Sequence, residues 1–236
     1  RAGGRVFYIG AGTSGRLGVL DAAECPPTFG TDPTQIIGLI AGGHATLVLS
    51  KEGVEDDQAA AIADLKAHKL ASHDFVIGIA ASRRTPYTLS GVQYAGLIGC
   101  KTAIVICNDP AGFEVSPDII VALPVGPEAI TGSTRMKSGT AQKLALNMIS
   151  TTAMVLLGKT YGNLMVDLQA KSDKLAARSR KILTELLGIS LDQASELLKR
   201  ADGSVKTAIV MHSCHCDKAA AQVKLNEANG FLSRIL

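Results

Sequence analysis

Five short apolar runs divide the first half of the chain, and we expect each to form a β-strand. They cover residues 5–9, 36–40, 75–80, 102–107 and 119–123. The runs are continuously apolar rather than alternating, as expected for strands that are covered on both faces of a parallel sheet. Helical spacing between the runs then predicts an α/β fold with a doubly wound, parallel, five-stranded sheet.

The segments between these runs predict three covering helices. The first is expected from about Ser14 until Pro26 and Pro27 stop it, because proline disrupts a helix interior. The second covers residues 54–65 and starts with acidic side chains, and the third covers about 86–97. Ligands of such folds bind at the carboxyl ends of the strands, so the loops that follow the strands are the candidate sites.

The second half of the chain begins with a long apolar helix and continues with more charged ones. Residues 140–157 are too apolar to face water on most sides and too few to span a membrane, so we expect a core or dimer helix. Further helices are expected over residues 171–187, 191–199 and 205–211. The predicted organisation is a main domain over residues 1–185 and a small C-terminal helical module over residues 186–236.

Composition narrows the class of protein. Hydrophobic residues make up 47% and charged residues 19% of the 236 residues, which excludes a disordered chain. The net charge of +3 is too small to indicate a nucleic-acid partner, and no apolar run reaches the ~18 residues of a membrane span. Because the chain opens on Arg1 directly before a strand, we expect that N-terminal residues are missing.

The five cysteines favour a reducing, cytoplasmic location. Two of them lie in or beside apolar segments that are predicted to form strands, which suits buried thiols. The run His212-Ser213-Cys214-His215-Cys216 is rich in metal-type ligands, but its spacing matches no zinc template. We therefore expect a helix end there, and no metal site.

A glycine-rich loop after the first strand carries the clearest chemical signal. Gly10 to Gly15 fits the G-x-G-x-x-G pattern of a dinucleotide site, which also requires an acid about 20 residues later, after the second strand. That strand ends in Ile40-Ala41-Gly42-Gly43 without an acid, and no lysine follows the glycines as it would in a Walker loop. Thr13 and Ser14 instead place hydroxyl groups at a helix N-terminus, which predicts a site for a single phosphate group.

Two further polar loops repeat this pattern, one after the third strand and one before the long apolar helix. Serine and threonine are ordinary helix caps, so capping would explain any one of the loops. Three of them at equivalent sheet ends favour a sugar-phosphate pocket. The expected phosphosugar-binding residues are Gly12, Thr13, Ser14, Ser82, Arg84, Thr85, Ser133 and Thr134.

Six stretches of the chain together resemble one family. They are residues 8–18, 20–28, 52–56, 126–128, 131–137 and 161–167. These specific motifs, spread over nearly the whole chain, resemble the SIS fold and, within it, the N-acetylmuramic acid 6-phosphate etherases. The resemblance implies an αβα sandwich in which residues 1–185 form the SIS domain, and it implies that the family's N-terminal helical segment is absent here.

The resemblance also implies an activity. The family cleaves the D-lactyl ether of N-acetylmuramic acid 6-phosphate, giving N-acetylglucosamine 6-phosphate and D-lactate in cell-wall recycling. The reaction is an elimination followed by addition of water, and it uses neither a metal nor an organic cofactor. The matching motifs place the proton donor on Glu24 and the second acid, the base, on Glu55.

Physical chemistry agrees with these two roles and raises a geometric problem. Ring opening exposes an aldehyde that acidifies the neighbouring C2 proton, so one carboxylate can remove it while another acid protonates the departing oxygen. Glu55 is expected in the first turn of a helix, where the dipole favours the ionised base, although neighbouring acids oppose this. Glu24 lies ~15 Å along a helix from Ser14. We therefore expect Glu24 to serve the pocket of a partner subunit in a homodimer.

One departure from the family pattern and two alternative functions stay open. The family reads Ala-Ser-Gly-Arg-Thr-Pro where this chain has Ala81-Ser82-Arg83-Arg84-Thr85-Pro86, so either the loop is reshaped or Arg83 adds a cation to the phosphate site. A non-catalytic sugar-phosphate sensor akin to the glucokinase regulatory protein would share the fold, but it would not need the proton donor Glu24. An aldose–ketose phosphate isomerase would act on a fructose or glucosamine phosphate without lactate chemistry.

Overall fold

The computed structural model describes residues 3–113, 115–168 and 172–236, which fall into two compact units. The sheet unit consists of residues 1–24 and 32–149, and the helical unit consists of residues 25–31 and 150–236. The predicted boundary after residue 185 lies within the helical unit, and the extent of the SIS domain stays a prediction.

Five parallel strands form the centre of the sheet unit, in the order β2-β1-β3-β4-β5. They are β1 (Val6–Gly10), β2 (Ile36–Ile40), β3 (Phe75–Ala80), β4 (Lys101–Ile106) and β5 (Ile119–Ala122). The register places Val6 opposite Ile36 on one side and opposite Phe75 on the other. The predicted doubly wound, five-stranded parallel sheet is confirmed, and its strand order reverses at β1.

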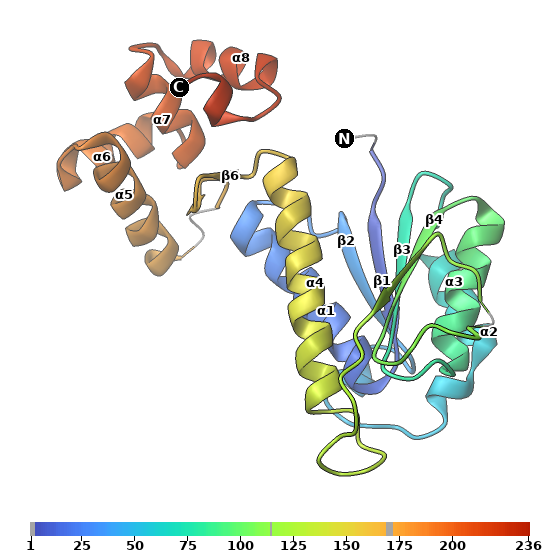
Figure 1. Ribbon diagram of the computed structural model, residues 1–236. Helices are drawn as coiled ribbons and strands as arrows, with labels where there is room; N and C mark the ends of the chain where they lie inside the picture. The colour runs from blue at the N-terminus through green and yellow to red at the C-terminus, as the bar shows by residue number, and fades with distance from the viewer. Residues whose placement is uncertain (1–2, 114, 169–171) are drawn as a thin grey trace. The chain divides into compact units, whose positions relative to one another are not determined.

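Helices cover both faces of this sheet (Figure 1). One face carries α1 (Gly12–Phe29) and α4 (Lys137–Leu156), and the other carries α2 (Gln58–Ala67) and α3 (Pro86–Ile98). Side chains of β1 alternate accordingly, as a pleated strand requires. Phe7 and Ile9 join the buried core with α2 and α3, whereas the Tyr8 hydroxyl donates a hydrogen bond to Asp21 of α1 at 2.9 Å.

The predicted end of the first helix is wrong. α1 includes Pro26 and Pro27 and ends at Phe29, before Gly30 with its φ of +62°. The fixed φ of proline is compatible with a helix, and each of the two prolines removes one N–H from the hydrogen-bond ladder of α1. The N–H of Gly30 closes the last turn on the Pro26 carbonyl at 2.9 Å.

The predicted helix over residues 54–65 is two elements rather than one. The 3-10 turn η2 (Val54–Asp56) precedes α2, and the Asp57 carboxylate caps α2 by accepting a hydrogen bond from the Ala60 N–H at 2.9 Å. An N-cap residue has non-helical dihedral angles, so the helix breaks at this aspartate. Glu55 therefore lies in a turn before the helix, and its predicted first-turn position was wrong.

Apart from the ends of α1 and α4, the described residues of the helical unit form a two-stranded ribbon and four α-helices. They are β6 (Thr160–Tyr161), β7 (Leu164–Met165), α5 (Asp173–Leu187), α6 (Leu191–Arg200), α7 (Val205–Ser213) and α8 (Lys218–Glu227). The ribbon and α8 were not predicted, and the predicted start of a helix at Lys171 lies outside the described residues. Leu183, Ile209 and Leu232 are fully buried in the core of this unit. Shorter 3-10 turns are η1 (His44–Leu47) and η3 (Leu232–Arg234).

A buried ion pair ties the ribbon segment of the helical unit to α7. The Lys206 ammonium, on a residue only 7% exposed, lies 2.7 Å from the Asp167 carboxylate and donates to the Gly158 carbonyl at 2.9 Å. Burial lowers the pKa of Lys206, against the opposing effect of Asp167. The last of the six family-like stretches, which ends at Asp167, thus has a structural role.

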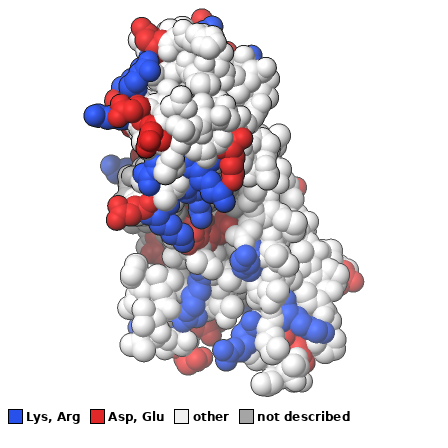
Figure 2. Space-filling view, turned by 90° about the vertical axis from the view of Figure 1, so that its left-hand side faces the viewer, with Lys and Arg blue, Asp and Glu red and all other residues white. Residues whose placement is uncertain are grey.

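The structure also bears on the predictions for the His/Cys run, the surface charge and membrane spans. α7 ends at Ser213 with Cys214 as its C-cap residue, which confirms the predicted helix end in the His/Cys run. Figure 2 shows basic and acidic side chains interspersed on one face, in keeping with the small net charge of +3. In the part of the chain that the structure describes, no helix combines the length and the apolar composition needed to cross a membrane.

Candidate active site

A pocket of about 410 Å³ opens at the carboxyl ends of three adjacent strands. Ala11, Ala41 and Ala81, each the first residue after β1, β2 or β3, all line it. β1 is where the strand order reverses, and open α/β sheets bind ligands at such a point. The volume is within the usual range for small-molecule sites.

Most of the predicted site residues meet in this pocket. Those that line it are Gly12, Thr13, Ser14, Glu55, Ser82, Thr85 and Thr134. Glu24, Arg84 and Ser133 are not among the lining residues. The pocket thus brings together the loops after β1 and β3 and the loop before α4, as the sequence predicts.

The glycine loop is tight because backbone atoms fill the space that side chains would need. A Cβ on Gly10 would lie 2.9 Å from the Gly15 nitrogen, and a Cβ on Gly15 would lie 2.6 Å from the Gly10 carbonyl oxygen. Gly12 has a φ of +54°, which glycine adopts without strain. α1 therefore begins almost immediately after the carboxyl end of β1. The N–H groups of its first turn, which have no partner within the helix, lie at the pocket.

The hydroxyl groups of the predicted loops differ in their hydrogen bonds. Thr85 is the N-cap residue of α3, but its side chain makes no capping hydrogen bond among the described residues. The Ser82 hydroxyl accepts a hydrogen bond from the Arg84 N–H at 3.3 Å, within its own loop. Ser14 donates to Oε1 of Gln142 in α4 at 2.9 Å. At Thr85 the capping explanation fails, and a hydroxyl group is left facing the pocket.

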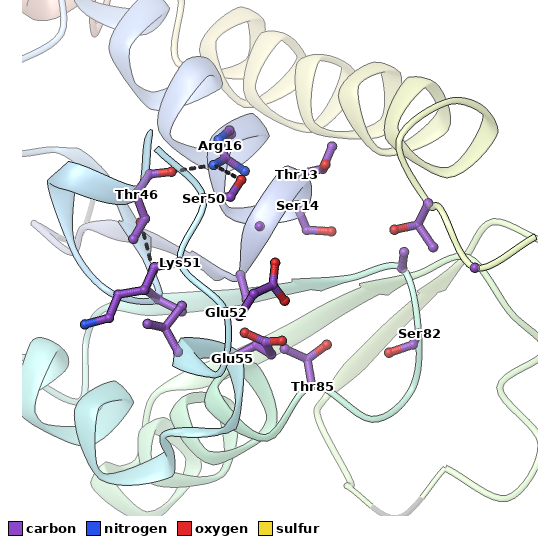
Figure 3. Close-up of a pocket in the computed structure, with 17 residues that line it drawn as sticks. Thr13, Ser14, Arg16, Thr46, Ser50, Lys51, Glu52, Glu55, Ser82 and Thr85 are labelled. Atoms are coloured by element: carbon purple, nitrogen blue, oxygen red, sulfur yellow. Dashed lines mark hydrogen bonds between the residues drawn. The ribbon is translucent and has the colours of Figure 1, made fainter. Parts of the chain in front are cut away.

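Arg16 shapes the pocket wall. Its guanidinium donates hydrogen bonds to the carbonyl oxygens of Thr46 and Leu47 and to the Ser50 hydroxyl. These bonds hold the loop after β2 against the first turns of α1 (Figure 3). The same loop brings Glu52 into the pocket lining.

Two carboxylates form one wall of the pocket. Glu52 and Glu55 both line it and turn their carboxyl groups inward, towards Ser14 and Thr85 (Figure 3). Glu55 is partly buried in η2, and Glu52 is exposed just before it. Nowhere in the described ranges do three His, Cys, Asp or Glu residues gather as a metal site requires. The pocket therefore places an acidic wall opposite a rim of N–H and hydroxyl groups, which suits a sugar that carries a phosphate at one end.

Glu128 fixes the third loop. Its carboxylate accepts hydrogen bonds from the N–H groups of Ser138 and Lys137, both at 3.0 Å, and so caps α4. These bonds hold the pKa of Glu128 below its ordinary value. The Lys137 ammonium donates to two carbonyls of the same loop. The segment with Gly132 and Thr134, both in the pocket lining, is thereby tied to the start of α4.

Arg83 and Arg84 line a second hollow, of about 460 Å³, and not the pocket. The Arg83 guanidinium donates a hydrogen bond to the Ala111 carbonyl. Arg83 is also not one of the described non-glycine residues with positive φ, so the loop accommodates it without left-handed strain. Arg83 adds no cation to the pocket lining, and phosphate binding by Arg84 stays a prediction.

Glu24 lies on an exposed part of α1, ten residues after Ser14 in the same helix. Its catalytic role stays a prediction, and the described acids that line the pocket of one subunit are Glu52 and Glu55.

The contribution of the loop after β2 was not predicted from the sequence. Its pocket-lining residues are Thr46, Ser50, Lys51 and Glu52. The one available signal was the family-like stretch 52–56, which contains Glu52. The others gave none, because their place depends on hydrogen bonds from Arg16, 30 or more positions away in the chain.

Comparison with known proteins identifies relatives along the whole chain. Residues 1–96 match the family model of the glucokinase regulatory protein N-terminal SIS domain. The N-acetylmuramic acid 6-phosphate etherase of Geobacillus thermodenitrificans is 51% identical over 100% of this chain and 80% of its own length. That of Erwinia tasmaniensis is 53% identical over 100% of this chain and 77% of its own length. Among solved structures, a phosphoheptose isomerase from Francisella tularensis is 16% identical, with 64% of this chain and 76% of that chain covered and a TM-score of 0.42.

Proposed function

The chain belongs to the N-acetylmuramic acid 6-phosphate etherase family, and from this premise we propose how its pocket carries out the reaction. The enzyme is a carbon–oxygen lyase that cleaves the D-lactyl ether of N-acetylmuramic acid 6-phosphate, giving N-acetylglucosamine 6-phosphate and D-lactate. The observation that carries the proposal is the pocket in which Glu55 lies together with the hydroxyl groups of Ser14 and Thr85.

The phosphate group binds at the rim. The N–H groups at the start of α1 and the hydroxyls of the three loops donate hydrogen bonds to its oxygens, and the helix dipole favours its negative charge. The residues assigned to this role are Gly12, Thr13, Ser14, Ser82, Arg84, Thr85, Ser133 and Thr134. Most of them line the pocket, which supports the assignment.

Glu55 acts as the base. After ring opening, its carboxylate takes the C2 proton, the C2–C3 double bond forms, and the C3–O bond to the lactyl group breaks. The departing oxygen takes a proton from a second acid. Water then adds across the double bond, with its oxygen at C3 and a proton at C2, and N-acetylglucosamine 6-phosphate results.

Glu24 supplies that second acid from a partner subunit. Its exposed position on α1, away from the pocket lining, suits donation across a dimer interface better than donation within one subunit. Leu20 of α1 and Leu144 and Met148 of α4 are about half exposed, and such apolar side chains favour a subunit contact. A homodimer with shared active sites follows from this assignment.

The enzyme works in the cytoplasm and without a metal or an organic cofactor. Cys100, Cys107, Cys214 and Cys216 form no disulfide among the described residues, and reduced thiols suit the reducing cytoplasm. The elimination needs only the acid and the base named above.

The direct test is to incubate the protein with N-acetylmuramic acid 6-phosphate and to assay D-lactate. Stoichiometric D-lactate and N-acetylglucosamine 6-phosphate are expected. Tight phosphosugar binding without D-lactate would instead indicate a sensor. Isomerisation of a fructose or glucosamine phosphate without lactate chemistry would indicate an isomerase.

A further inference from the structure

A hydrogen bond between Ser14 and Gln142 lies beside the proposed phosphate site, and one atom of the Gln142 amide lacks a partner among the described residues. The Ser14 hydroxyl and the Gln142 amide are hydrogen-bonded at 2.9 Å between Ser14 Oγ and Gln142 Oε1. Both residues are buried, with 7% and 1% of their surface exposed. The Gln142 Nε2 atom is buried and has no hydrogen-bond partner among the described residues. Buried polar groups are normally paired, so this amide nitrogen requires an explanation.

The contact also fixes which way the Ser14 hydroxyl points its proton. An amide oxygen only accepts hydrogen bonds, so Ser14 must donate its single proton to Gln142 and can then only accept on the pocket side. Phosphate oxygens need donors. A Ser14 hydroxyl that donates to Gln142 therefore cannot also donate its proton to a phosphate oxygen.

Rotation of the Gln142 amide by 180° about its last side-chain bond resolves both problems. Nε2 then takes the place of Oε1 and donates to Ser14 Oγ, and the Ser14 proton is free to point at the phosphate. The resulting chain of donors runs from amide N–H to hydroxyl to phosphate oxygen, and each bond polarises the next. The atom left without a partner becomes a carbonyl oxygen, which is more often tolerated than an unpaired N–H.

We propose that Gln142 is a positioning residue that sets the hydrogen-bond polarity of Ser14, so that Ser14 donates to the phosphate of the bound sugar. The inference rests on the proposed role of Ser14 in phosphate binding. α4 is close enough for this role, because a Cβ on Gly139, one turn before Gln142, would lie 3.4 Å from the Thr13 side chain.

Gln142→Glu tests the polarity because a carboxylate keeps the acceptor and removes the donor. Affinity for N-acetylglucosamine 6-phosphate, measured by calorimetry near neutral pH, is expected to fall at least about ten-fold. Lowering the pH should restore affinity in this variant alone, because the protonated carboxyl can donate to Ser14. Gln222→Glu, on exposed α8 of the helical unit, adds the same charge and should leave affinity unchanged.

A double-mutant cycle separates the relay from simple charge repulsion. Ser14→Ala should weaken binding, and adding Gln142→Glu to it should weaken binding no further. A further loss of about ten-fold in the Ser14→Ala background would overturn the relay, since the effect would then not pass through Ser14. If Ser14→Ala binds like the wild type, the phosphate role of Ser14 fails and the relay fails with it.

Gln142→Met provides the test if the buried carboxylate prevents folding. It fills the space, removes both donor and acceptor, and leaves the Ser14 proton unoriented. The expected loss of affinity is smaller than for Gln142→Glu, about two- to five-fold, with the melting temperature measured in parallel. Unchanged affinity in this variant would refute the positioning role.

Discussion

Glu55 is the base in the proposed mechanism. We expect Glu55→Gln to lower kcat by about 10²- to 10⁴-fold, because it removes the base but keeps the shape. KM and the melting temperature should change little, because the amide occupies the same partly exposed place. Steady-state kinetics of D-lactate release give both parameters.

Asp56→Asn is the matched control for this substitution. It removes a negative charge from the same 3-10 turn, but Asp56 is exposed and does not line the pocket. Near-normal kcat is expected. Equal losses in the two variants would mean that local charge, and not a base at Glu55, supports the reaction.

Glu128 contributes stability that depends on pH. The N–H groups of Ser138 and Lys137 hold the pKa of the folded-state Glu128 carboxyl below its ordinary value. Its contribution is thus fully present above the unfolded pKa and is lost as the pH falls through the lower, folded pKa.

Melting temperatures of wild type and Glu128→Gln, measured between about pH 6 and pH 3, check this contribution. The difference between the two proteins should be largest at the upper end and should shrink as the pH falls below about 4. A constant difference would show that the carboxylate cap of α4 adds nothing through its charge.

Some residues of the pocket could be predicted from the sequence, and others could not. The motif that contains Glu55 identified an acid that does line the pocket, and three loops of Thr and Ser identified the rim. Glu52, by contrast, was treated only as an opposing charge, because its entry into the pocket depends on how Arg16 holds the loop. Arg84 was predicted to bind the phosphate because it is a cation in the loop after β3, yet its side chain lines the neighbouring hollow.

The turn from β1 into α1 is the element on which the pocket depends. Gly15→Ala would place a methyl group 2.6 Å from the Gly10 carbonyl oxygen and 2.7 Å from the Ile40 side chain. We expect it to destabilise the protein by about 2–3 kcal/mol and to raise KM as the turn moves. Urea unfolding and steady-state kinetics measure the two effects.

Gly96→Ala in α3 is the control for this element. Its Cβ would meet nothing within 4 Å, and the residue is exposed in a helix. Alanine favours helix more than glycine does, so a gain of roughly 0.5–1 kcal/mol is expected. If both substitutions proved neutral, the close strand–helix approach would not be needed.

At the scale of elements, apolar runs predicted all five strands to within one or two residues, because strands buried on both faces leave a strong signal. Helix limits were less predictable. α1 runs through Pro26 and Pro27, whose fixed φ is compatible with a helix, and Asp57 starts α2 later than periodicity alone indicated. The two-residue strands β6 and β7 are too short to leave a pattern.

For the whole molecule, the alternation of strands and helices predicted the doubly wound sheet correctly, whereas the limits of its domains do not follow from local pattern. The compact units include residues 25–31 with the helical unit, a grouping that depends on contacts between distant segments. Gly30 illustrates such a contact, because a Cβ there would lie 2.2 Å from the Asp167 carbonyl oxygen.

The dimer proposal makes a prediction for the assembled molecule. Glu24→Ala and Glu55→Ala chains should each be inactive alone. Coexpression in equal amounts should restore about a quarter of wild-type activity, because half the dimers are mixed and each mixed dimer has one intact pocket. No recovery, in preparations that size-exclusion chromatography shows to contain dimers, would mean that Glu24 acts within its own subunit.

The central claim is that this pocket carries out elimination followed by hydration, and isotopic water tests it most directly. The enzyme is incubated with N-acetylmuramic acid 6-phosphate in H₂¹⁸O, and both products are analysed by mass spectrometry. Cleavage of the C3–O bond predicts one ¹⁸O at C3 of N-acetylglucosamine 6-phosphate, beyond aldehyde exchange, and none in the hydroxyl of D-lactate. Label in the D-lactate hydroxyl instead would contradict the account.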